Sequence, residues 1–146
     1  MNNSVVKVLL IEDDNDLQDA FTIREIVFVK EQKVSHEEEF DEFDIISRHF
    51  IAKVKGVSVG TARWRETNKG IKLERFTVLK EYRGMGVGSA LVSAVLKDID
   101  HLIENSKGKC YLHAQVEAIP LYAKFGFQSQ GDIFMECDIP HQNMIL

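Results

Sequence analysis

Three glycines stand at alternate positions in the segment KEYRGMGVGSALVSAVL, residues 80–96: Gly84, Gly86 and Gly88. Arg83 precedes them, and a strongly apolar helical pattern follows. Glycine destabilises a helix interior by about 1 kcal/mol relative to alanine, because it loses more backbone freedom on folding. The segment therefore predicts a junction between a strand and a helix in which the glycines have a task other than helix formation.

A helix that begins at glycines is suited to binding an anion. Its first backbone N–H groups have no partner within the helix, and the helix dipole adds partial positive charge there. Glycine lets a phosphate approach the backbone without meeting a Cβ atom, and Arg83 adds a full charge beside it. A tight turn without a ligand would need one glycine, so the three favour a phosphate-containing ligand.

Two common phosphate-binding patterns do not fit this segment. The pattern GxxxxGK[ST] is absent from the chain, and GxGxxG fails because its last position, counted from Gly84, is Ser89. Rossmann glycines also follow the first strand of an α/β unit, whereas these glycines come after several predicted strands. A nucleotide-binding module is therefore disfavoured.

The length of 146 residues predicts one domain, residues 1–146, and hydrophobic periodicity predicts the α+β class. Helices are expected at residues 17–30, 87–102 and 120–125, with Gly108 ending the second, and strands at 5–11, 47–56, 57–66, 71–80, 109–116 and within 127–138. Residues 139–146 are expected to form a tail. Because strands joined by short turns pair antiparallel, this order predicts a mixed, largely antiparallel central sheet flanked by helices.

The net charge of −5, without a basic tract, argues against a nucleic-acid partner or an anionic membrane surface and leaves room for a cationic substrate. No apolar run approaches the roughly 18 residues that cross a bilayer, and the N-terminus lacks the features of a signal peptide. Cys110 and Cys137 form no CxxC pair, so a metal site is not expected. We expect a cytoplasmic protein with two buried thiols, a disulfide being the minor alternative.

The residues RGMGVGSA, 83–90, resemble the Arg/Gln-x-x-Gly-x-Gly/Ala signature of the GNAT superfamily, the acyl-CoA-dependent N-acyltransferases. The longer segments LERFTVLKEYRGMGVGSALV (73–92) and AIPLYAKFGF (118–127) also look like elements of this family. Further segments resemble the ElaA/YjcF-type bacterial branch of this superfamily. They span residues 23–144 and include IREIVFVKEQKVSHEEEFDEFD, GTARWR and DIPHQNM. The resemblance implies the acyl-CoA N-acyltransferase fold and acetyl-CoA as co-substrate.

The resemblance also implies how the chain would hold coenzyme A. Backbone groups of Phe76, Thr77 and Val78 would line the pantetheine and the acetyl group, although Phe76 and Val78 also suit core packing. The pyrophosphate would lie against the loop formed by Arg83, Gly84, Met85, Gly86, Val87, Gly88 and Ser89. By the same resemblance Gln115 would lie near the coenzyme, although it departs from the asparagine that relatives often carry at this position.

Acyl transfer to an amine needs a proton donor for the departing thiolate and a base for the amine. By resemblance Tyr122 is the donor, unless it is only a packed aromatic. Glu74 is one candidate base, because its neighbours Leu73 and Phe76 could raise its pKa, but it could instead form a salt bridge with Arg63 or Arg75. His113 is another candidate, with a structural role as its alternative, and a water chain is a third possibility.

Arg24 and His141 match positions characteristic of this branch, and the resemblance implies that they bind the substrate. Arg24 also needs an acidic partner, expected among residues 37–44, because an unpaired buried charge is costly. Two functions then remain open. The first is an N-acetyltransferase in which a primary amine of a small molecule or protein attacks acetyl-CoA directly in a ternary complex. The alternative is a catalytically silent acyl-CoA-binding regulatory or partner module. Either one is expected to be a monomer or homodimer.

Overall fold

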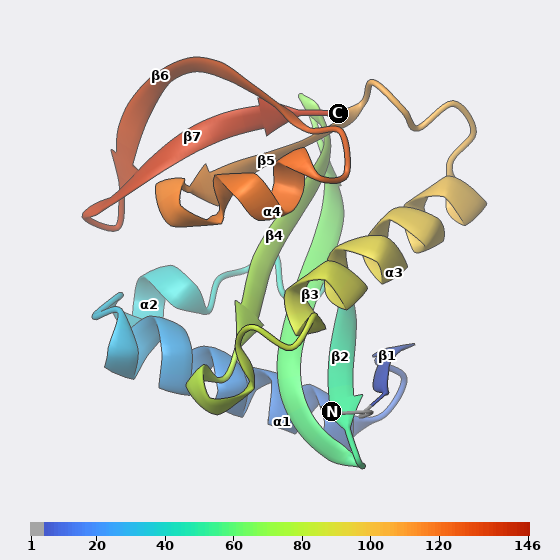
Figure 1. Ribbon diagram of the computed structural model, residues 1–146, viewed down its shortest axis with the longest axis vertical. Helices are drawn as coiled ribbons and strands as arrows, with labels where there is room; N and C mark the ends of the chain where they lie inside the picture. The colour runs from blue at the N-terminus through green and yellow to red at the C-terminus, as the bar shows by residue number, and fades with distance from the viewer. Residues whose placement is uncertain (1–4) are drawn as a thin grey trace.

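Seven strands form one sheet in the order β1-β2-β3-β4-β5-β7-β6 (Figure 1). The computed structural model describes residues 5–146. The strands are β1 (Val6–Leu10), β2 (Arg48–Val54), β3 (Val57–Thr67), β4 (Gly70–Val78), β5 (Cys110–Gln115), β6 (Gln128–Glu136) and β7 (Ile139–Ile145). All neighbouring pairs are antiparallel except β4 and β5, which run parallel. The predicted mixed, largely antiparallel sheet is confirmed.

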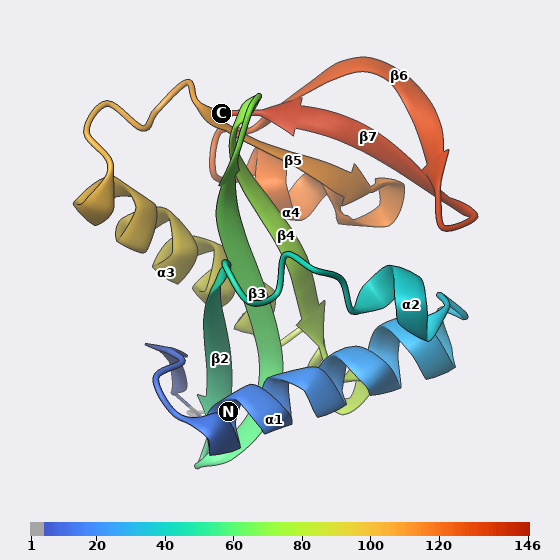
Figure 2. The ribbon, with the colours of Figure 1, turned by 180° about the vertical axis from the view of Figure 1, so that it is seen from behind.

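Helices cover both faces of this sheet. The helices are α1 (Asp14–Arg24), which continues as the π-helical segment η1 (Glu25–Glu31), α2 (His36–Glu39), α3 (Val87–Leu102) and α4 (Ile119–Ala123), with short 3-10 turns η2 (Lys80–Tyr82) and η3 (Val116–Ala118). α3 and α4 lie in front of the sheet in Figure 1, whereas α1 and α2 lie in front of it in the reverse view of Figure 2. Among the described residues, no helix is long and apolar enough to cross a membrane.

The β2–β3 hairpin turns where the sequence predicts it. Lys55 and Gly56 have φ values of +51° and +79°, and this left-handed pair matches the twist of the two strands they join. One helix boundary differs from expectation. α3 ends at Leu102, well before Gly108, because Ile103 already adopts an extended conformation.

The segment IPHQNMIL is not a tail: it contains strand β7, which lies between β5 and β6. Met144 on this strand is 1% exposed and packs into the core. The three polar residues 141–143 conceal the strand in the sequence, since they interrupt the alternation of polar and apolar residues that identifies strands.

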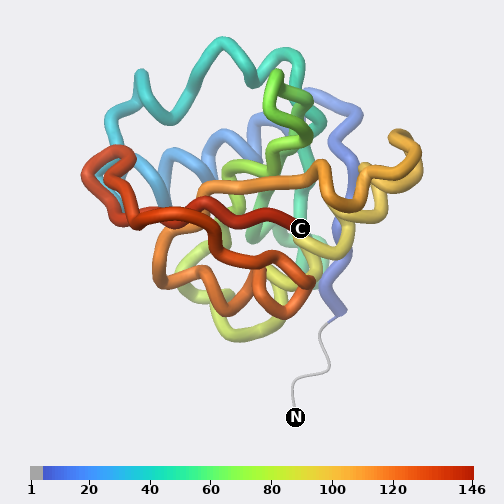
Figure 3. The backbone as a smooth tube through the Cα atoms, turned by 90° about the horizontal axis from the view of Figure 1, so that it is seen from above, coloured from blue at the N-terminus to red at the C-terminus, as the bar shows by residue number. Residues whose placement is uncertain are grey.

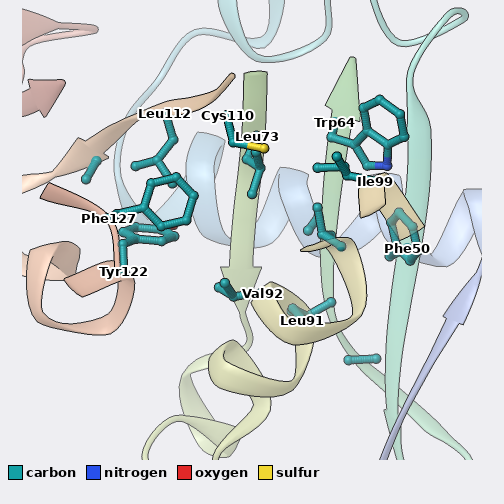
Figure 4. Close-up of a cluster of buried hydrophobic side chains, with 14 of the residues drawn as sticks. Phe50, Trp64, Leu73, Leu91, Val92, Ile99, Cys110, Leu112, Tyr122 and Phe127 are labelled. Atoms are coloured by element: carbon teal, nitrogen blue, oxygen red, sulfur yellow. The ribbon is translucent and has the colours of Figure 1, made fainter. Parts of the chain in front are cut away.

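The apolar stripe of α3 packs on the sheet and forms the centre of the core, part of which is shown in Figure 4. Leu91, Val95 and Ile99 on this helix have no exposed surface. Burying each such side chain stabilises the fold by roughly 1.5–3 kcal/mol. This packing holds the N-terminus of α3 against β3 and β4, which fixes the position of the glycine junction.

The sheet splits between β4 and β5. These strands pair only where Ile71, Lys72 and Leu73 face residues 110–112, and they diverge beyond that point (Figure 1). β4 also contains a bulge at Arg75, whose φ is +62°, where its register with β3 shifts. The bulge was not predicted from sequence. It re-aims the side chains of β4 beside the point where the two strands separate.

Candidate active site

A cleft of about 280 Å³ occupies the space between the diverging strands β4 and β5. Segment η1 and α2 border it on one side, and α4 and the β6–β7 turn border it on the other. Many predicted site residues line it: Glu74, Phe76, Thr77, Val78, Arg83, Gly88, His113, Gln115, Tyr122 and His141. The structure therefore brings together residues from five separate segments of the chain.

The open edge of β4 forms one wall of the cleft. Because β5 pairs with β4 only as far as Leu73, residues 74–78 present backbone N–H and C=O groups toward the gap. An extended ligand can bind such an edge as an additional strand would. Thr77 also has a buried hydroxyl oxygen without a hydrogen-bond partner among residues 5–146. Phe76 and Val78 meanwhile pack against the core, so both of their expected roles are compatible with the structure.

The three glycines of the junction have two different tasks. Gly84 and Gly86 adopt left-handed φ values of +79° and +84°, and a Cβ atom on either would project into open space. Gly88 is instead a contact point, because its Cβ would lie 3.3 Å from the Leu121 side chain on α4. The first helical hydrogen bond of α3 runs from Ala90 N to Gly86 O (3.0 Å), so the N–H groups of residues 87–89 have no helical acceptor.

Two cations lie beside this junction. The Arg83 guanidinium donates two hydrogen bonds to the Glu31 carboxylate, at 2.8 and 2.9 Å, and a third to Val78 O. These contacts with Arg83 lower the pKa of Glu31. Lys124 Nζ donates to Ser89 Oγ at 2.9 Å. Neither Glu31 nor Lys124 was predicted to belong to the site, because only the packing of η1 and α4 brings them to this loop.

Glu74 does not have the environment expected of a base. Its carboxylate accepts hydrogen bonds from Arg63 (3.0 Å) and Arg65 (2.7 Å), and Lys72 Nζ lies 3.2 Å away. Burial opposes ionisation of this carboxyl, but the three cations outweigh it and lower its pKa to about 2. The expected rise in pKa is therefore wrong, and the alternative salt bridge with Arg63 is present. The β3–β4 register is the cause, since it pairs Arg63 with Glu74.

Arg24 is enclosed by the fold and does not reach the cleft. It is 1% exposed, and its guanidinium donates to Glu39 and Asp44 at distances of 2.7–3.3 Å. The expected acidic partner within residues 37–44 is thus confirmed. Because all of the contacts of this side chain are internal, we do not retain Arg24 as a substrate contact.

Tyr122 lies at the bottom of the cleft on α4. Its ring contacts Phe76 (centroids 5.7 Å apart) and Phe127 (6.2 Å), which lies beside it in Figure 4. Burial raises the pKa of Tyr122 above its ordinary value, so the hydroxyl stays protonated at neutral pH. No described residue forms a hydrogen bond with this hydroxyl, which leaves it able to donate to a ligand.

A cluster of two histidines and one carboxylate lies at the other end of the cleft. His113 Nδ1 is 3.2 Å from Glu136 Oε1, and His141 Nε2 is 3.7 Å from Glu136 Oε2. His141 is buried, whereas His113 and Glu136 are half-buried. The hydrogen bond with His113 lowers the pKa of Glu136, although partial burial opposes this effect. Glu136 was not predicted from sequence, because only the strand order β5-β7-β6 places it beside His113.

Two contacts connect the walls of the cleft. Gln115 Nε2 donates to Gln32 Oε1 (2.8 Å), which ties the end of β5 to the loop after η1. Cys137 Sγ lies 3.3 Å from Glu38 Oε2, and Figure 3 shows the β6–β7 turn beside the segment that contains Glu38. Both cysteines are free; Cys110 is buried as expected, but Cys137 is partly exposed because it forms the turn.

Comparison with known proteins identifies relatives over nearly the whole chain. A protein-family model described as "Acetyltransferase (GNAT) domain" matches residues 18–146. A Bacillus subtilis protein named "Uncharacterized N-acetyltransferase YjcF" is 37% identical over 141 residues, which are 96% of this chain and 99% of that protein. Escherichia coli ElaA has a TM-score of 0.82 and 26% identity, with 97% of each chain covered. An acyl-CoA N-acyltransferase from Pseudomonas aeruginosa has a TM-score of 0.80 and 23% identity, covering 97% of this chain and 98% of that chain.

Proposed function

The chain belongs to the GNAT acetyltransferase family and is an acyltransferase, and on this premise we propose that it transfers an acetyl group from acetyl-CoA to a primary amine. One observation carries the proposal. The open β4 edge at residues 74–78 is followed, after the short turn η2, by the glycine junction at residues 84–88, so a strand-like ligand on the edge would end in an anion at the start of α3. The pantetheine and pyrophosphate of coenzyme A have this order of chemical groups.

The residues around the cleft suit coenzyme A. The pantetheine amides would pair with backbone groups of residues 76–78. The pyrophosphate would accept hydrogen bonds from N–H groups of the loop at residues 83–89, where Arg83 and Lys124 supply positive charge. The thioester would then lie near Tyr122, which contacts Phe76 on β4.

We assign the transfer itself to direct attack within a ternary complex. The neutral amine nitrogen attacks the thioester carbonyl carbon, the new C–N bond forms, and the C–S bond breaks. A backbone N–H of the β4 edge would stabilise the negative charge that develops on the carbonyl oxygen. Tyr122 would donate a hydrogen bond and then its proton to the departing sulfur, and would recover a proton from solvent.

His113 is our candidate for the base that takes the proton from the amine. Glu74 is unsuitable, because a carboxylate whose pKa is about 2 has too low a proton affinity to take a proton from an amine at neutral pH. His113 lines the cleft, and histidine is the side chain that most often serves as a general base in enzymes. The proposed acceptor is a small molecule or an amine of a protein, and the site needs residues of a single chain, whether monomer or homodimer.

Two measurements on the purified protein test this proposal. Calorimetry with acetyl-CoA is expected to show one site per chain, and release of free CoA thiol is expected with at least one amine of a panel of monoamines, diamines and peptides. Tight acetyl-CoA binding without turnover of any acceptor would favour the catalytically silent binding module. Absence of acetyl-CoA binding would overturn the assignment of the glycine junction.

A further inference from the structure

Strands β5, β6 and β7 turn one polar face toward the cleft. Cross-strand pairing places Gln115 opposite His141, and His141 opposite Phe134 on β6, so these side chains share a face. His113 lies two residues before Gln115 on the same face. Glu136 lies two residues after Phe134 and so joins them. This face is where a side-chain base would meet an acceptor that enters the cleft.

The two imidazole rings on this face are held by an aromatic side chain between them. Phe134 packs edge-on against His113, with ring centroids 5.1 Å apart, and stacks on His141 at 6.0 Å. His141 Nδ1 also donates to Ile139 O at 2.6 Å. These contacts orient both histidines, so the short distance from His113 to Glu136 is part of a packed arrangement.

The contact with Glu136 distinguishes the two nitrogens of His113. An ionised carboxylate only accepts hydrogen bonds, so the proton of neutral His113 lies on Nδ1, 3.2 Å from Glu136 Oε1. Nε2 then carries the free lone pair, and no group among residues 5–146 forms a hydrogen bond with it. We propose that Glu136 is a positioning residue that holds His113 with Nε2 ready to accept a proton from the acceptor amine.

This inference rests on the proposed N-acetyltransferase function, within which it identifies how the base is prepared. The acceptor arrives as R–NH3⁺ and gives one proton to His113 Nε2, which leaves R–NH2 and an imidazolium. The Glu136 carboxylate stabilises that imidazolium by charge, as carboxylates do for histidines in other catalytic pairs. The imidazolium then returns its proton to solvent, and R–NH2 attacks the thioester carbonyl. The nitrogen gives its second proton to the again neutral His113 Nε2 as the C–S bond breaks, and His113 passes that proton to solvent as well.

Other titratable groups surround the His113–Glu136 pair, and several of them affect the ionisation of Glu136. His141 on β7 and Lys72 on β4 favour the ionised form of Glu136, as does His113 itself. Cys137 follows Glu136 in the turn and contacts Glu38 on α2. Tyr111 lies against His113 from the same strand, with ring centroids 6.0 Å apart. Among residues 5–146, Glu136 is the one carboxylate with an oxygen within 4 Å of a His113 ring nitrogen.

The first test compares E136Q with the wild-type protein and with D132N, a control on an exposed carboxylate of the same strand. For E136Q we expect kcat to fall roughly 10-fold and the acid limb of the kcat/KM profile to move roughly one pH unit lower, because the stabilising charge is lost. The Kd for acetyl-CoA and the thermal unfolding temperature are expected to stay unchanged, and D132N is expected to match wild type. An unchanged pH profile in E136Q would overturn the proposal.

A double-mutant cycle then asks whether Glu136 acts through His113. In an H113A background, E136Q is expected to reduce kcat less than 2-fold, because residues that act as a unit are not additive. In the otherwise wild-type protein, E136D is expected to have a kcat between those of E136Q and wild type, because it keeps a carboxylate at this position. An equal loss from E136Q in both backgrounds would contradict the proposal.

A measurement without turnover separates this inference from the proposed function. Imidazole ¹⁵N chemical shifts are expected to show the Nδ1–H form of neutral His113 in the wild-type protein and a mixture with Nε2–H in E136A. If no amine is acetylated but the Nδ1–H form is found, the proposed function fails while the positioning of His113 stands. A wild-type His113 in the Nε2–H form would overturn the positioning, whatever the activity.

Discussion

The two ends of the cleft are built in different ways. The expected coenzyme end consists mainly of backbone groups from one continuous stretch, residues 74–89. The expected acceptor end consists of side chains from β5, β6, β7 and the segment around α2, which are far apart in the chain. A backbone site depends on local conformation and on glycine, whereas a side-chain site depends on strand order and register. The first can therefore be recognised in a short motif, and the second cannot.

Glu74 and Glu136 show the same contrast within one residue type. Both line the cleft and both have a lowered pKa, but the partners differ. Three cations neutralise Glu74, which is 8% exposed. Glu136 faces two histidines and remains half-buried. We therefore expect Glu74 to serve stability and Glu136 to serve chemistry.

The largest expected effect breaks the backbone-built end. G86E is expected to weaken acetyl-CoA binding beyond roughly 10³-fold, because its carboxylate would enter the anion site and repel the pyrophosphate. Calorimetry measures this loss. G56E is the matched control, since Gly56 has a similar φ of +79°, also has open space around it, and lies in a distant turn. Coenzyme affinity in G86E equal to that of G56E would refute the assignment of the loop.

The next largest effect is expected from E74Q, which tests whether Glu74, unlike Glu136, serves stability. E74Q is expected to lower the free energy of unfolding by about 3 kcal/mol at pH 7, because Arg63 keeps its charge in a buried site. The Glu74 carboxylate stabilises the native state fully above about pH 4.5, and this contribution is lost as the pH falls toward about 2. The stability difference between E74Q and wild type should thus shrink over that range in urea titrations. A shifted acid limb of kcat/KM in E74Q would return Glu74 to the list of bases.

The variant Y122F tests whether Tyr122 acts on the thioester, where the coenzyme end and the acceptor end of the cleft are expected to meet. Y122F is expected to lower kcat by roughly 10²-fold, because the departing sulfur loses its proton donor. Its Kd for acetyl-CoA should not change, since the phenyl ring keeps its packing against Phe76. Y111F, which loses a hydrogen bond with Thr67, is the control for removal of a hydroxyl. Unchanged turnover in Y122F would remove Tyr122 from the mechanism.

The smallest expected effect concerns the ion pair between η1 and the loop. E31Q is expected to tighten acetyl-CoA binding by up to about 5-fold at low salt, because Arg83 no longer has to leave a carboxylate to reach the pyrophosphate. Calorimetry at two salt concentrations measures it, with the exposed Glu42 changed in E42Q as control. Weaker binding in E31Q would show instead that Glu31 holds Arg83 in its binding position.

Local sequence patterns identified most of the elements. The β2–β3 turn was recognised from Lys55-Gly56 alone, and helix α3 from the spacing of its apolar residues. Both features depend only on residues close together in the chain. Strand β7 was missed because its place in the sheet depends on pairing with β5, which is distant in the chain. The bulge at Arg75 was missed because it depends on the register between β4 and β3, which no local pattern shows. For the same reason the cations around Glu74 reversed the expected direction of its pKa shift.

The sequence by itself determined the fold class, the glycine junction and the family, because these follow from short-range periodicity, from backbone conformations favoured by glycine, and from contiguous motifs. Only the tertiary structure decided which side chains face one another across the cleft. It paired Arg63 with Glu74, brought Glu136 from β6 to His113 on β5, and brought Lys124 to Ser89. Proton affinity depends on charges within a few ångströms, and those distances are set by strand order and register, which no local pattern records.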